Sequence, residues 1–270
     1  MQPFDLHTHS LYSDGTASPA EIVREAQRLG LAMVAITDHD TADGVNEALA
    51  EGERIGMKVI PGVEFDVDYD VTMHILGLGI DVNAPALQEA VRESARKRDI
   101  RNRVMIEKLR ALGMDISMED VHSVGLKTRL HIAEALVRKG YAATWGEAFD
   151  KYMLKGRPAF VRAENLPIRE TVEVIHKAGG IAVLAHPCQI RGDKHKAILA
   201  AVEGGIDGIE AYYPGTTDGE RVLYLSLAAQ YGLLVSSGSD HHGANRPAAT
   251  LGCAFQDVEV LRPIFERFMA

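Results

Sequence analysis

The sequence predicts an α/β protein, a distorted (β/α)7 barrel with an inserted helical segment. Two observations predict this fold class. Short apolar runs alternate with amphipathic stretches along most of the 270 residues, which is the pattern of a barrel-like parallel sheet covered by helices. The alternation stops between residues 85 and 164, where no strand-like run occurs. We therefore expect residues 1–84 and 165–270 to form the barrel, and residues 85–164 to form a helical cap over its mouth.

Seven apolar runs have the length and composition of buried strands. Seven is one fewer than the eight strands of a closed (β/α) barrel, so we expect a distorted or incomplete relative of that fold. In parallel barrels the functional residues lie at the carboxyl ends of the strands. The seven runs are Phe4–His9, Met33–Thr37, Lys58–Val63, Thr72–Leu78, Gly180–Ala185, Gly208–Tyr212 and Leu233–Ser237.

Helices are predicted between most of these strands from their start and stop signals. Ser18 is followed by proline and then, at the third helical position, by Glu21, which is the pattern of a capping box. That helix should end at Gly30, because glycine readily adopts the left-handed conformation that closes many helices. Two further helices, each followed by glycine, are expected at Arg169–Ala178 and Asp218–Tyr231.

The inserted segment combines helical patterns with an unusual share of basic residues. Its helices are expected at Ala86–Leu112, as one helix or two, and at Thr128–Lys139 and Thr144–Lys151. Arginine and lysine concentrate here although the whole chain has a formal net charge of −9. This arrangement indicates an anionic substrate. The residues predicted to bind it are Arg101, Asn102, Arg129 and Arg157.

Most other arginines of this segment are expected on a solvated face. Arg157 follows a glycine and precedes a proline, so we expect a rigid loop to present its guanidinium to a phosphate. Aromatic residues also recur at helical spacing, and we interpret them as core of the cap rather than as a platform for stacking bases. These aromatic residues are Tyr141, Trp145, Phe149 and Tyr152.

Composition and charge exclude several classes of protein. The net charge of −9 argues against general nucleic-acid binding, and no stable binding to duplex nucleic acid is expected. Two cysteines imply no disulfide framework, so a reducing cytoplasm is the expected location. The start of the sequence lacks the pattern of a signal peptide. No apolar run reaches the roughly 18 residues that a membrane span needs, so no membrane partner is expected.

Two histidines in the first strand-like run are the strongest functional signal. His7 and His9 are two residues apart, so their side chains share one face of an extended chain and can bind one metal ion. Asp240 and His242 repeat this spacing near the other end of the sequence. Further candidate ligands lie at or near the carboxyl ends of other strands, namely His39, Glu64, His74 and His186. The pattern indicates a metal-dependent hydrolase.

Taken together, these motifs resemble the PHP (polymerase and histidinol phosphatase) family over nearly the whole chain apart from the insertion. The signature is His7-Thr8-His9, Thr37-Asp38-His39, Glu64, His74, His186-Pro187 and Asp240-His241-His242. Within the family, the chain resembles small enzymes that dephosphorylate nucleoside 3′,5′-bisphosphates and also trim short RNA from its 5′ end. That resemblance rests on the inserted helices and on the strings Leu11-Tyr12-Ser13-Asp14-Gly15 and Thr37-Asp38-His39-Asp40-Thr41.

The resemblance implies up to three metal ions. The first ion would be bound by His7, His9, Glu64 and Asp240. Glu64 would also bind the second ion, together with His74 and His186. The third ion would be bound by Asp14, His39 and His242. Many relatives have a histidine where this chain has Asp14, and an oxygen ligand favours a harder ion. Mn²⁺ is therefore the expected ion, with Fe²⁺ and Zn²⁺ as alternatives.

The resemblance also implies hydrolysis of a phosphate monoester. Such a monoester is a dianion that repels hydroxide, and divalent ions offset this repulsion and lower the pKa of a bound water. The expected nucleophile is a metal-bridging hydroxide, so no catalytic side chain attacks the phosphorus. The preferred substrate is a nucleoside 3′,5′-bisphosphate that loses its 3′-phosphate while the cap arginines hold the other phosphate.

Other interpretations stay open at this point. A 5′→3′ exonuclease on short RNA would use the same site. A histidinol-phosphate phosphatase would need an acidic pocket for the ammonium and imidazole groups of its substrate. A non-catalytic PHP module would be expected to have lost some of the metal ligands. Asp38 and Asp40 are expected either to orient His39 or to cap a helix. Glu210 is expected to be structural, although a supporting role at the site stays open, and His241 is not expected to bind metal.

Overall fold

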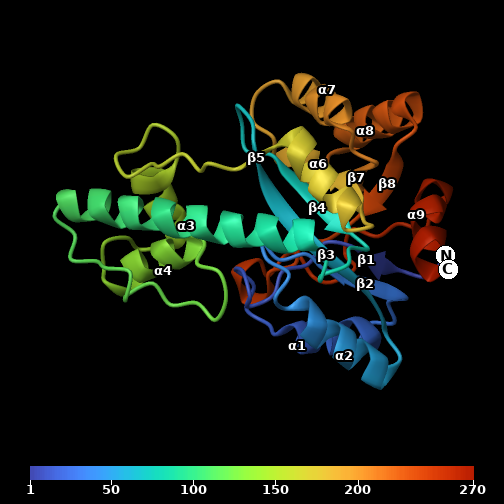
Figure 1. The fold of residues 1–270 in the computed structure, drawn as a ribbon, viewed down its shortest axis with the longest axis horizontal. Helices are drawn as coiled ribbons and strands as arrows, with labels where there is room; N and C mark the ends of the chain where they lie inside the picture. The colour runs from blue at the N-terminus through green and yellow to red at the C-terminus, as the bar shows by residue number, and fades with distance from the viewer.

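The computed structural model describes residues 1–270 and shows a mixed α/β protein with a nearly closed barrel of seven strands (Figure 1). Neighbouring strands follow the order β1-β2-β3-β4-β6-β7-β8. All seven predicted strands are confirmed, and a short additional strand, β5, pairs with the end of β3. The strands are β1 (Phe4–Asp5), β2 (Met33–Ile36), β3 (Lys58–Asp68), β4 (His74–Leu78), β5 (Leu166–Pro167), β6 (Ile181–Leu184), β7 (Gly208–Tyr212) and β8 (Leu234–Ser237).

Backbone hydrogen bonds between the two ends of the strand order bring the barrel close to closure. The amide of Leu6, just after β1, donates to the carbonyl of Ser237 at 3.1 Å. Farther along, the amide of Asp240 donates to the carbonyl of His7 at 2.9 Å, and that of His9 to the carbonyl of His241 at 2.8 Å. This pairing places the first predicted ligand motif beside the last one, although more than 200 residues separate them in the sequence.

The prediction of an all-parallel barrel is wrong at β4, which runs antiparallel to both β3 and β6. The reason is the short connection between β3 and β4, because a parallel crossover needs about a dozen residues or more. The strand β3 also continues past its predicted end to Asp68 and forms a hairpin with β4. His74 is therefore the first residue of its strand, and the reversal of β4 brings it to the edge where the parallel strands end.

The outer helices follow the predicted signals closely. Ser18 and Glu21 form the expected capping box, since the Glu21 amide donates to the Ser18 hydroxyl at 3.2 Å and the Ser18 amide donates to the Glu21 carboxylate at 2.7 Å. The helices are α1 (Pro19–Arg28), α2 (Val45–Ile55), α6 (Ile168–Lys177), α7 (Lys194–Gly204), α8 (Asp218–Tyr231) and α9 (Arg262–Met269), with 3-10 turns at Pro187–Gln189, Gly243–Asn245 and Glu259–Leu261.

The inserted segment is helical, as predicted, and begins with one continuous helix, α3 (Pro85–Ala111). It continues with α4 (Arg129–Arg138), the short α5 (Trp145–Ala148) and a π-helical turn at Phe149–Met153. Figure 1 shows α3 projecting away from the barrel with α4 beside its far half. That half builds a hydrophobic cluster of its own with α4, whose members include Met105, Leu109, Ile132, Leu136 and Met153.

The first turns of α3 belong to the barrel instead. Leu87 and Val91 are part of the large hydrophobic core that also contains Phe4, Ile75 and Ile209. A long helix rooted in the barrel core therefore carries the remaining cap helices. The exact division at residues 85 and 164 stays a prediction.

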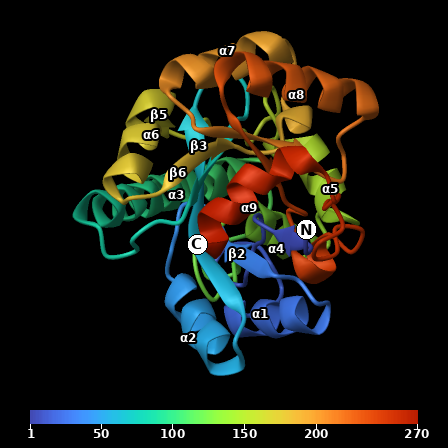
Figure 2. The ribbon, with the colours of Figure 1, turned by 90° about the vertical axis from the view of Figure 1, so that its right-hand side faces the viewer.

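The two ends of the barrel are covered differently. Figure 2 shows α9 lying across the end beside both chain termini, where Ile264 packs into the barrel core. The inserted segment lies at the other end (Figure 1). None of the helices is long and apolar enough to cross a membrane.

Candidate active site

The nine predicted metal ligands lie together at one edge of the barrel. They form four overlapping groups, and within each group one donor atom per residue lies within 4.8 Å of the others. The groups are His9, Asp14, His39 and His242; His7, His9 and Asp240; His7, Glu64 and His186; and His39, Glu64 and His74. Nine residues that are spread between His7 and His242 in the sequence thus contribute to one cluster of nitrogen and oxygen donors.

Glu64 lies at the centre of this cluster and is fully buried. One carboxylate oxygen, Oε1, is 2.9 Å from His186 Nε2 and 3.0 Å from His74 Nδ1. The other oxygen, Oε2, is 2.9 Å from His39 Nδ1 and 3.2 Å from His9 Nε2. A carboxylate with different neighbours on its two oxygens can bridge two metal ions.

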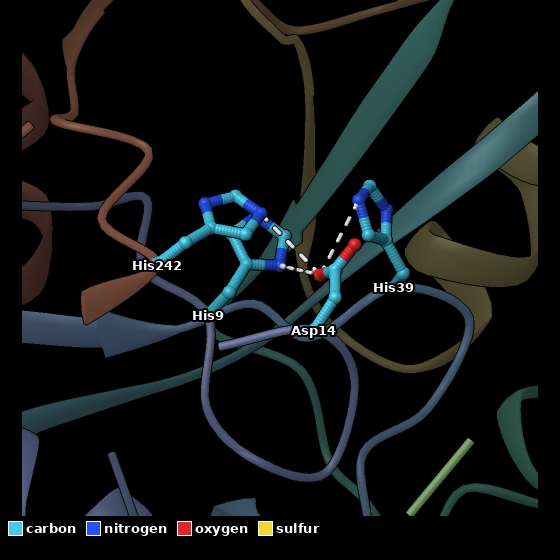
Figure 3. Close-up of side chains that lie close together, drawn as sticks. All are labelled: His9, Asp14, His39 and His242. Atoms are coloured by element: carbon cyan, nitrogen blue, oxygen red, sulfur yellow. Dashed lines mark ion pairs between the residues drawn. The ribbon is translucent and has the colours of Figure 1, made fainter. Parts of the chain in front are cut away.

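Asp14 joins the third predicted group from the loop after β1. Figure 3 shows its carboxylate directed towards the imidazoles of His9, His39 and His242. Its Oδ1 atom is 3.3 Å from His242 Nε2 and 3.9 Å from a ring nitrogen of each of the other two histidines. The aspartate therefore lies within the donor cluster, and its role as a metal ligand stays a prediction.

Two of these ligands have an unusual backbone conformation. His186 has a φ of 25° and Asp240 a φ of 55°, in the left-handed region that residues other than glycine rarely adopt. Such strain persists only where the surrounding contacts fix the residue, and it concentrates at functional sites.

The charges of the cluster shift its pKa values strongly. Burial lowers the pKa of His39, but the carboxylates of Glu64 and Asp14 outweigh burial and raise it to about 9. Burial opposes the charge on His74 in the same way, and Glu64 and Asp66 raise its pKa to about 9. The histidines in turn hold the pKa of the buried Glu64 well below its usual value. The charged histidines and carboxylates thus stabilise one another within the cluster.

Glu210 contacts the cluster directly, which favours the supporting role that the sequence left open over a purely structural one. Its buried carboxylate contacts His7 Nδ1 at 3.1 Å and accepts a hydrogen bond from the backbone amide of His186 at 2.7 Å. A carboxylate on the far nitrogen of a ligand histidine fixes the ring orientation and the tautomer. The signal in the sequence was a charged residue inside an otherwise apolar strand.

Asp38 and Asp40 have neither of the two predicted roles. Asp38 accepts hydrogen bonds from Ser10 and Ser13, and so holds the loop after the first histidine motif. Asp40 accepts from the amide of Asp66 and pairs with Arg98. Neither carboxylate contacts His39 or caps α2, whose first turn has no side-chain cap. Each fixes a neighbouring segment of backbone instead.

His241 is not part of the donor cluster, as predicted. Its Nδ1 atom lies 2.7 Å from the carbonyl oxygen of Ala249. The alternation of side chains along Asp240-His241-His242 separates it from its two neighbours.

A pocket of about 190 Å³ lies over the cluster. Its lining includes seven of the predicted ligands together with residues that sequence reasoning missed. The missed lining residues are Leu130, Gln189, Asn245 and Arg246. Arg246 forms an ion pair with Asp240, and the Tyr213 hydroxyl donates to the same carboxylate at 3.2 Å. No local pattern marked Arg246, because its role depends on the loop that follows the last ligand motif.

The interpretation of the four aromatic residues as cap core holds for Tyr141 and Tyr152, and in part for Phe149. Tyr141, Phe149 and Tyr152 pack against the hydrophobic cluster of the cap. Trp145 does not belong to it, and its side chain is 42% exposed. Trp145 lines the pocket instead, together with the partly buried Phe149. Helical spacing alone does not indicate which face of so short a helix meets a pocket.

Some basic residues near the pocket pair with carboxylates, and others have no carboxylate partner. Arg98 of α3 donates to Asp40 at 2.6 Å and lies 3.1 Å from Asp66. Asp66 in turn lies 3.2 Å from His74 Nε2 and 3.7 Å from His39 Nδ1. A buried chain of charges therefore joins α3 to the metal-ligand cluster.

Two of the predicted substrate-binding residues, Arg101 and Arg129, have no carboxylate partner. Arg101 is 3% exposed and donates only to Asn102 Oδ1, at 2.8 Å. Arg129 donates to the carbonyl of Val161 at 3.1 Å, and its Nε atom is buried without a partner. Burial and the neighbouring arginines lower the pKa of Arg101. Neither arginine lines the pocket over the ligands, but both act electrostatically on Asp66 beside it.

The other two predicted substrate-binding residues differ in their surroundings. Asn102 is buried, and its amide donates to the carbonyl of Lys127 at 2.8 Å, so it holds Arg101 in place within the cap. Arg157 lies in an exposed turn, and its side chain neither lines the pocket nor pairs with a carboxylate. A direct role for Arg157 stays a prediction.

The donor cluster fits divalent metal ions. Asp14 Oδ1, His39 Nδ1 and Glu64 Oε2 are buried atoms whose close contacts with other predicted ligands lack hydrogen-bond geometry, and an unsatisfied buried polar atom is costly unless a ligand binds it. The mixture of imidazole and carboxylate donors suits Mn²⁺, Fe²⁺ and Zn²⁺. The fold and this donor set together define a metal-dependent phosphoesterase.

Comparison with known proteins identifies the family. The family model described as the PHP domain matches residues 5–141, and the chain belongs to this family. A putative metal-dependent phosphoesterase from Bifidobacterium adolescentis has the same fold, with a TM-score of 0.87 and 31% identity over 98% of this chain and 96% of that one. The resemblance inferred from the sequence motifs is therefore confirmed.

Curated relatives of similar length carry different activities in their names. A 5′-3′ exoribonuclease from Haemophilus influenzae is 33% identical over 98% of both chains. A 3′,5′-nucleoside bisphosphate phosphatase from Chromobacterium violaceum is 32% identical over 100% of this chain and 98% of its own. A phosphoribosyl 1,2-cyclic phosphate 1,2-diphosphodiesterase from Eggerthella lenta is 31% identical over 88% and 94%. All three names describe cleavage of a phosphate ester, and they differ in the substrate.

Proposed function

We propose that this phosphoesterase removes the 3′-phosphate of a nucleoside 3′,5′-bisphosphate, for example converting adenosine 3′,5′-bisphosphate to AMP and phosphate. The observation that carries the proposal is a pair of guanidiniums without carboxylate partners near the donor cluster, namely the buried Arg101 and the partly buried Arg129. A substrate with two phosphates matches a site that has metal ligands on one side and surplus buried positive charge on the other. The likeness to the Chromobacterium violaceum phosphatase over the whole chain supports the same substrate.

The proposed metal ligands are the nine residues of the cluster, grouped as the family resemblance implies. Bound divalent ions, with Mn²⁺ proposed first, would offset the charge of the phosphate and activate a water as the nucleophile. The protein's own part is to hold that arrangement: Glu210 fixes the ring of His7, and the loop bonds of Asp38 fix the segment between His9 and Asp14. Arg246 is the only arginine that lines the pocket, and we propose that it contacts the phosphate to be cleaved.

Substitution of the unpaired arginines tests the two-phosphate site. Arg129→Ala and Arg101→Met should raise KM for adenosine 3′,5′-bisphosphate by roughly 10- to 100-fold, the size expected for one lost hydrogen bond to a charged group. The same variants should change KM for p-nitrophenyl phosphate far less, because that substrate has no second phosphate. Arg157→Ala, assayed in parallel, decides whether the exposed turn contributes.

The control for this experiment is Arg103→Ala on the same helix as Arg101. Arg103 is exposed and pairs only with Asp99 one helical turn away, so its loss should leave both KM values unchanged. Thermal unfolding of each variant checks that the cap remains folded. Equal losses on the bisphosphate and on the aryl phosphate would contradict the role proposed for the arginines.

A second candidate is 5′→3′ exonuclease activity on short RNA. The observation that favours it is the likeness to the Haemophilus influenzae exoribonuclease over nearly the full length of both chains. The same metal ligands would serve, and the cap would then bind a strand rather than one nucleotide. The test compares two rates, the release of mononucleotides from a short 5′-phosphorylated RNA and the release of phosphate from the bisphosphate. A faster release of mononucleotides would favour this candidate.

The other interpretations receive less support. Histidinol phosphate would need carboxylates for its ammonium and imidazole groups, yet every carboxylate that lines the pocket belongs to the proposed metal ligands. A non-catalytic module is disfavoured because no position of the ligand pattern is lost. A phosphoesterase acting on a small phosphorylated nucleotide remains the proposal.

A further inference from the structure

Three apolar side chains line an otherwise polar pocket. Leu130 comes from the first turn of α4, Trp145 from α5 and Phe149 from the π-helical turn that follows. All three belong to the inserted segment, whereas the predicted metal ligands in the lining belong to the barrel. The pocket therefore joins an apolar part provided by the cap to a charged part provided by the barrel.

Trp145 is the exposed member of this apolar part. It lies outside the hydrophobic cluster of the cap, and 42% of its surface stays exposed. Its helix is nevertheless fixed at its start, because the amide of Glu147 donates to the Thr144 hydroxyl at 3.1 Å and the amide of Ala143 donates to the Glu147 carboxylate at 2.6 Å. Capping hydrogen bonds thus fix the backbone that carries the indole, while the indole itself stays partly exposed.

Phe149 follows Trp145 by four residues, so the two side chains lie on one face of the helical turn. Phe149 packs partly against the cap core, which anchors this face, while both rings line the pocket. Two aromatic rings and a leucine give the pocket an apolar part next to the predicted metal ligands. A nucleotide has this combination of properties, with a stacking base at one end and phosphates at the other.

We propose that Trp145 and Phe149 form a base-stacking site that binds the nucleobase of the substrate. The inference rests on the proposed function and adds the part of the substrate that neither the metal ligands nor the arginines contact. Stacking uses the π-face that every base has, so it discriminates weakly between bases. The site should therefore accept purine and pyrimidine nucleotides while disfavouring substrates without a base.

Intrinsic fluorescence tests binding without turnover, because Trp145 is the only tryptophan in the chain. Titration of the metal-loaded protein with AMP should quench its emission. Ribose 5-phosphate, which has the same phosphate and sugar but no base, should leave the emission nearly unchanged at equal saturation. Equal quenching by the two compounds, or none by either, would overturn the base-stacking site.

Kinetics on a matched pair of substrates gives the second test. The wild-type protein should prefer adenosine 3′,5′-bisphosphate over its abasic analogue by about tenfold in KM, the size expected for one stacked base. Trp145→Ala should lose most of this preference, and Trp145→Phe should retain most of it. Tyr231→Ala is the control, since Tyr231 is a similarly exposed aromatic residue at the end of α8 that does not line the pocket.

The two tests separate failure of this inference from failure of the proposed function. If the wild-type protein hydrolyses the bisphosphate but Trp145→Ala keeps the full preference for the base, the base-stacking site is wrong and the function stands. If AMP quenches the emission but no bisphosphate is hydrolysed, the function is wrong and the base-stacking site stands.

Discussion

Glu64 and Glu210 are both fully buried carboxylates, and their surroundings give them different parts in the site. Glu64 contacts five histidines through its two oxygens, and its Oε2 atom forms no hydrogen bond of ordinary geometry with them. Glu210 is instead satisfied by His7 and by the amide of His186. An unsatisfied buried oxygen fits a metal ligand, and a satisfied one fits a residue that orients a ligand.

Glu210→Gln should weaken metal binding without emptying the site. The amide removes the negative charge beside His7 Nδ1, so the histidine loses the partner that fixes its ring. The expected loss is about 10- to 100-fold in metal affinity or in activity at limiting metal, with recovery at high metal concentration. Metal titration followed by activity measures it. Glu203→Gln, on the exposed surface of α7, is the control, and an equal effect of both variants would refute the role of Glu210.

The raised pKa values of His39 and His74 predict how metal binding and stability depend on pH. Both histidines have a folded-state pKa of about 9, above the unfolded value of about 6.5. Their contribution to the stability of the metal-free protein is therefore complete below pH 6.5 and is lost as the pH rises through 9. Metal binding needs neutral imidazoles, so it should strengthen over the same range.

Thermal unfolding in EDTA and in Mn²⁺ between pH 6 and 9 measures both effects. The Tm in EDTA should fall between pH 6.5 and 9, while the increase in Tm caused by Mn²⁺ should grow. A Tm in EDTA that rises over this interval would show that the histidines are not held in their charged form by the carboxylates.

At the scale of elements, the helix α3 connects the barrel to the cap. Its first turns pack into the barrel core, and its far half packs against α4. Between these parts, Arg98 pairs with Asp40 and Asp66, and Asp66 contacts His74. The position of the cap is therefore tied to the metal-ligand cluster by buried charges as well as by apolar packing.

Arg98→Ala should destabilise the fold by about 3–5 kcal/mol, because removal of one partner leaves buried carboxylates without compensation. Chemical denaturation measures the change in the free energy of unfolding. The matched control is Arg96→Ala on the same helix, whose exposed side chain pairs with Glu93 and whose loss should leave the unfolding midpoint nearly unchanged. Similar midpoints for the two variants would contradict the anchoring role of Arg98.

For the molecule as a whole, local spacing made much of the site predictable. His7 with His9, and Asp240 with His242, are two residues apart, and the geometry of extended chain directs each pair to one face. The seven strands and the first helix likewise follow from short-range patterns, as the capping box at Ser18 shows. Features that depend on periodicity alone could therefore be predicted from the sequence.

Features that depend on distant contacts could not be predicted. The contact of Glu210 with His7 joins residues 203 positions apart, and no spacing rule indicates it. The antiparallel direction of β4 is a different case, because it follows from the short connection between residues 64 and 71, which the alternation of strands and helices did not take into account. Trp145 was assigned to the cap core because its helical spacing matches that of core residues, yet the structure places it in the pocket.

The central claim is that one site combines metal-assisted phosphate ester cleavage with recognition of a second phosphate. The most direct test is phosphate release by the Mn²⁺-loaded protein from adenosine 3′,5′-bisphosphate, AMP, histidinol phosphate and a short 5′-phosphorylated RNA, with products identified by mass. We predict rapid conversion of the bisphosphate to 5′-AMP and slow attack on the other three. Preferential attack on RNA or on histidinol phosphate, or no reaction with any of the four, would contradict the account.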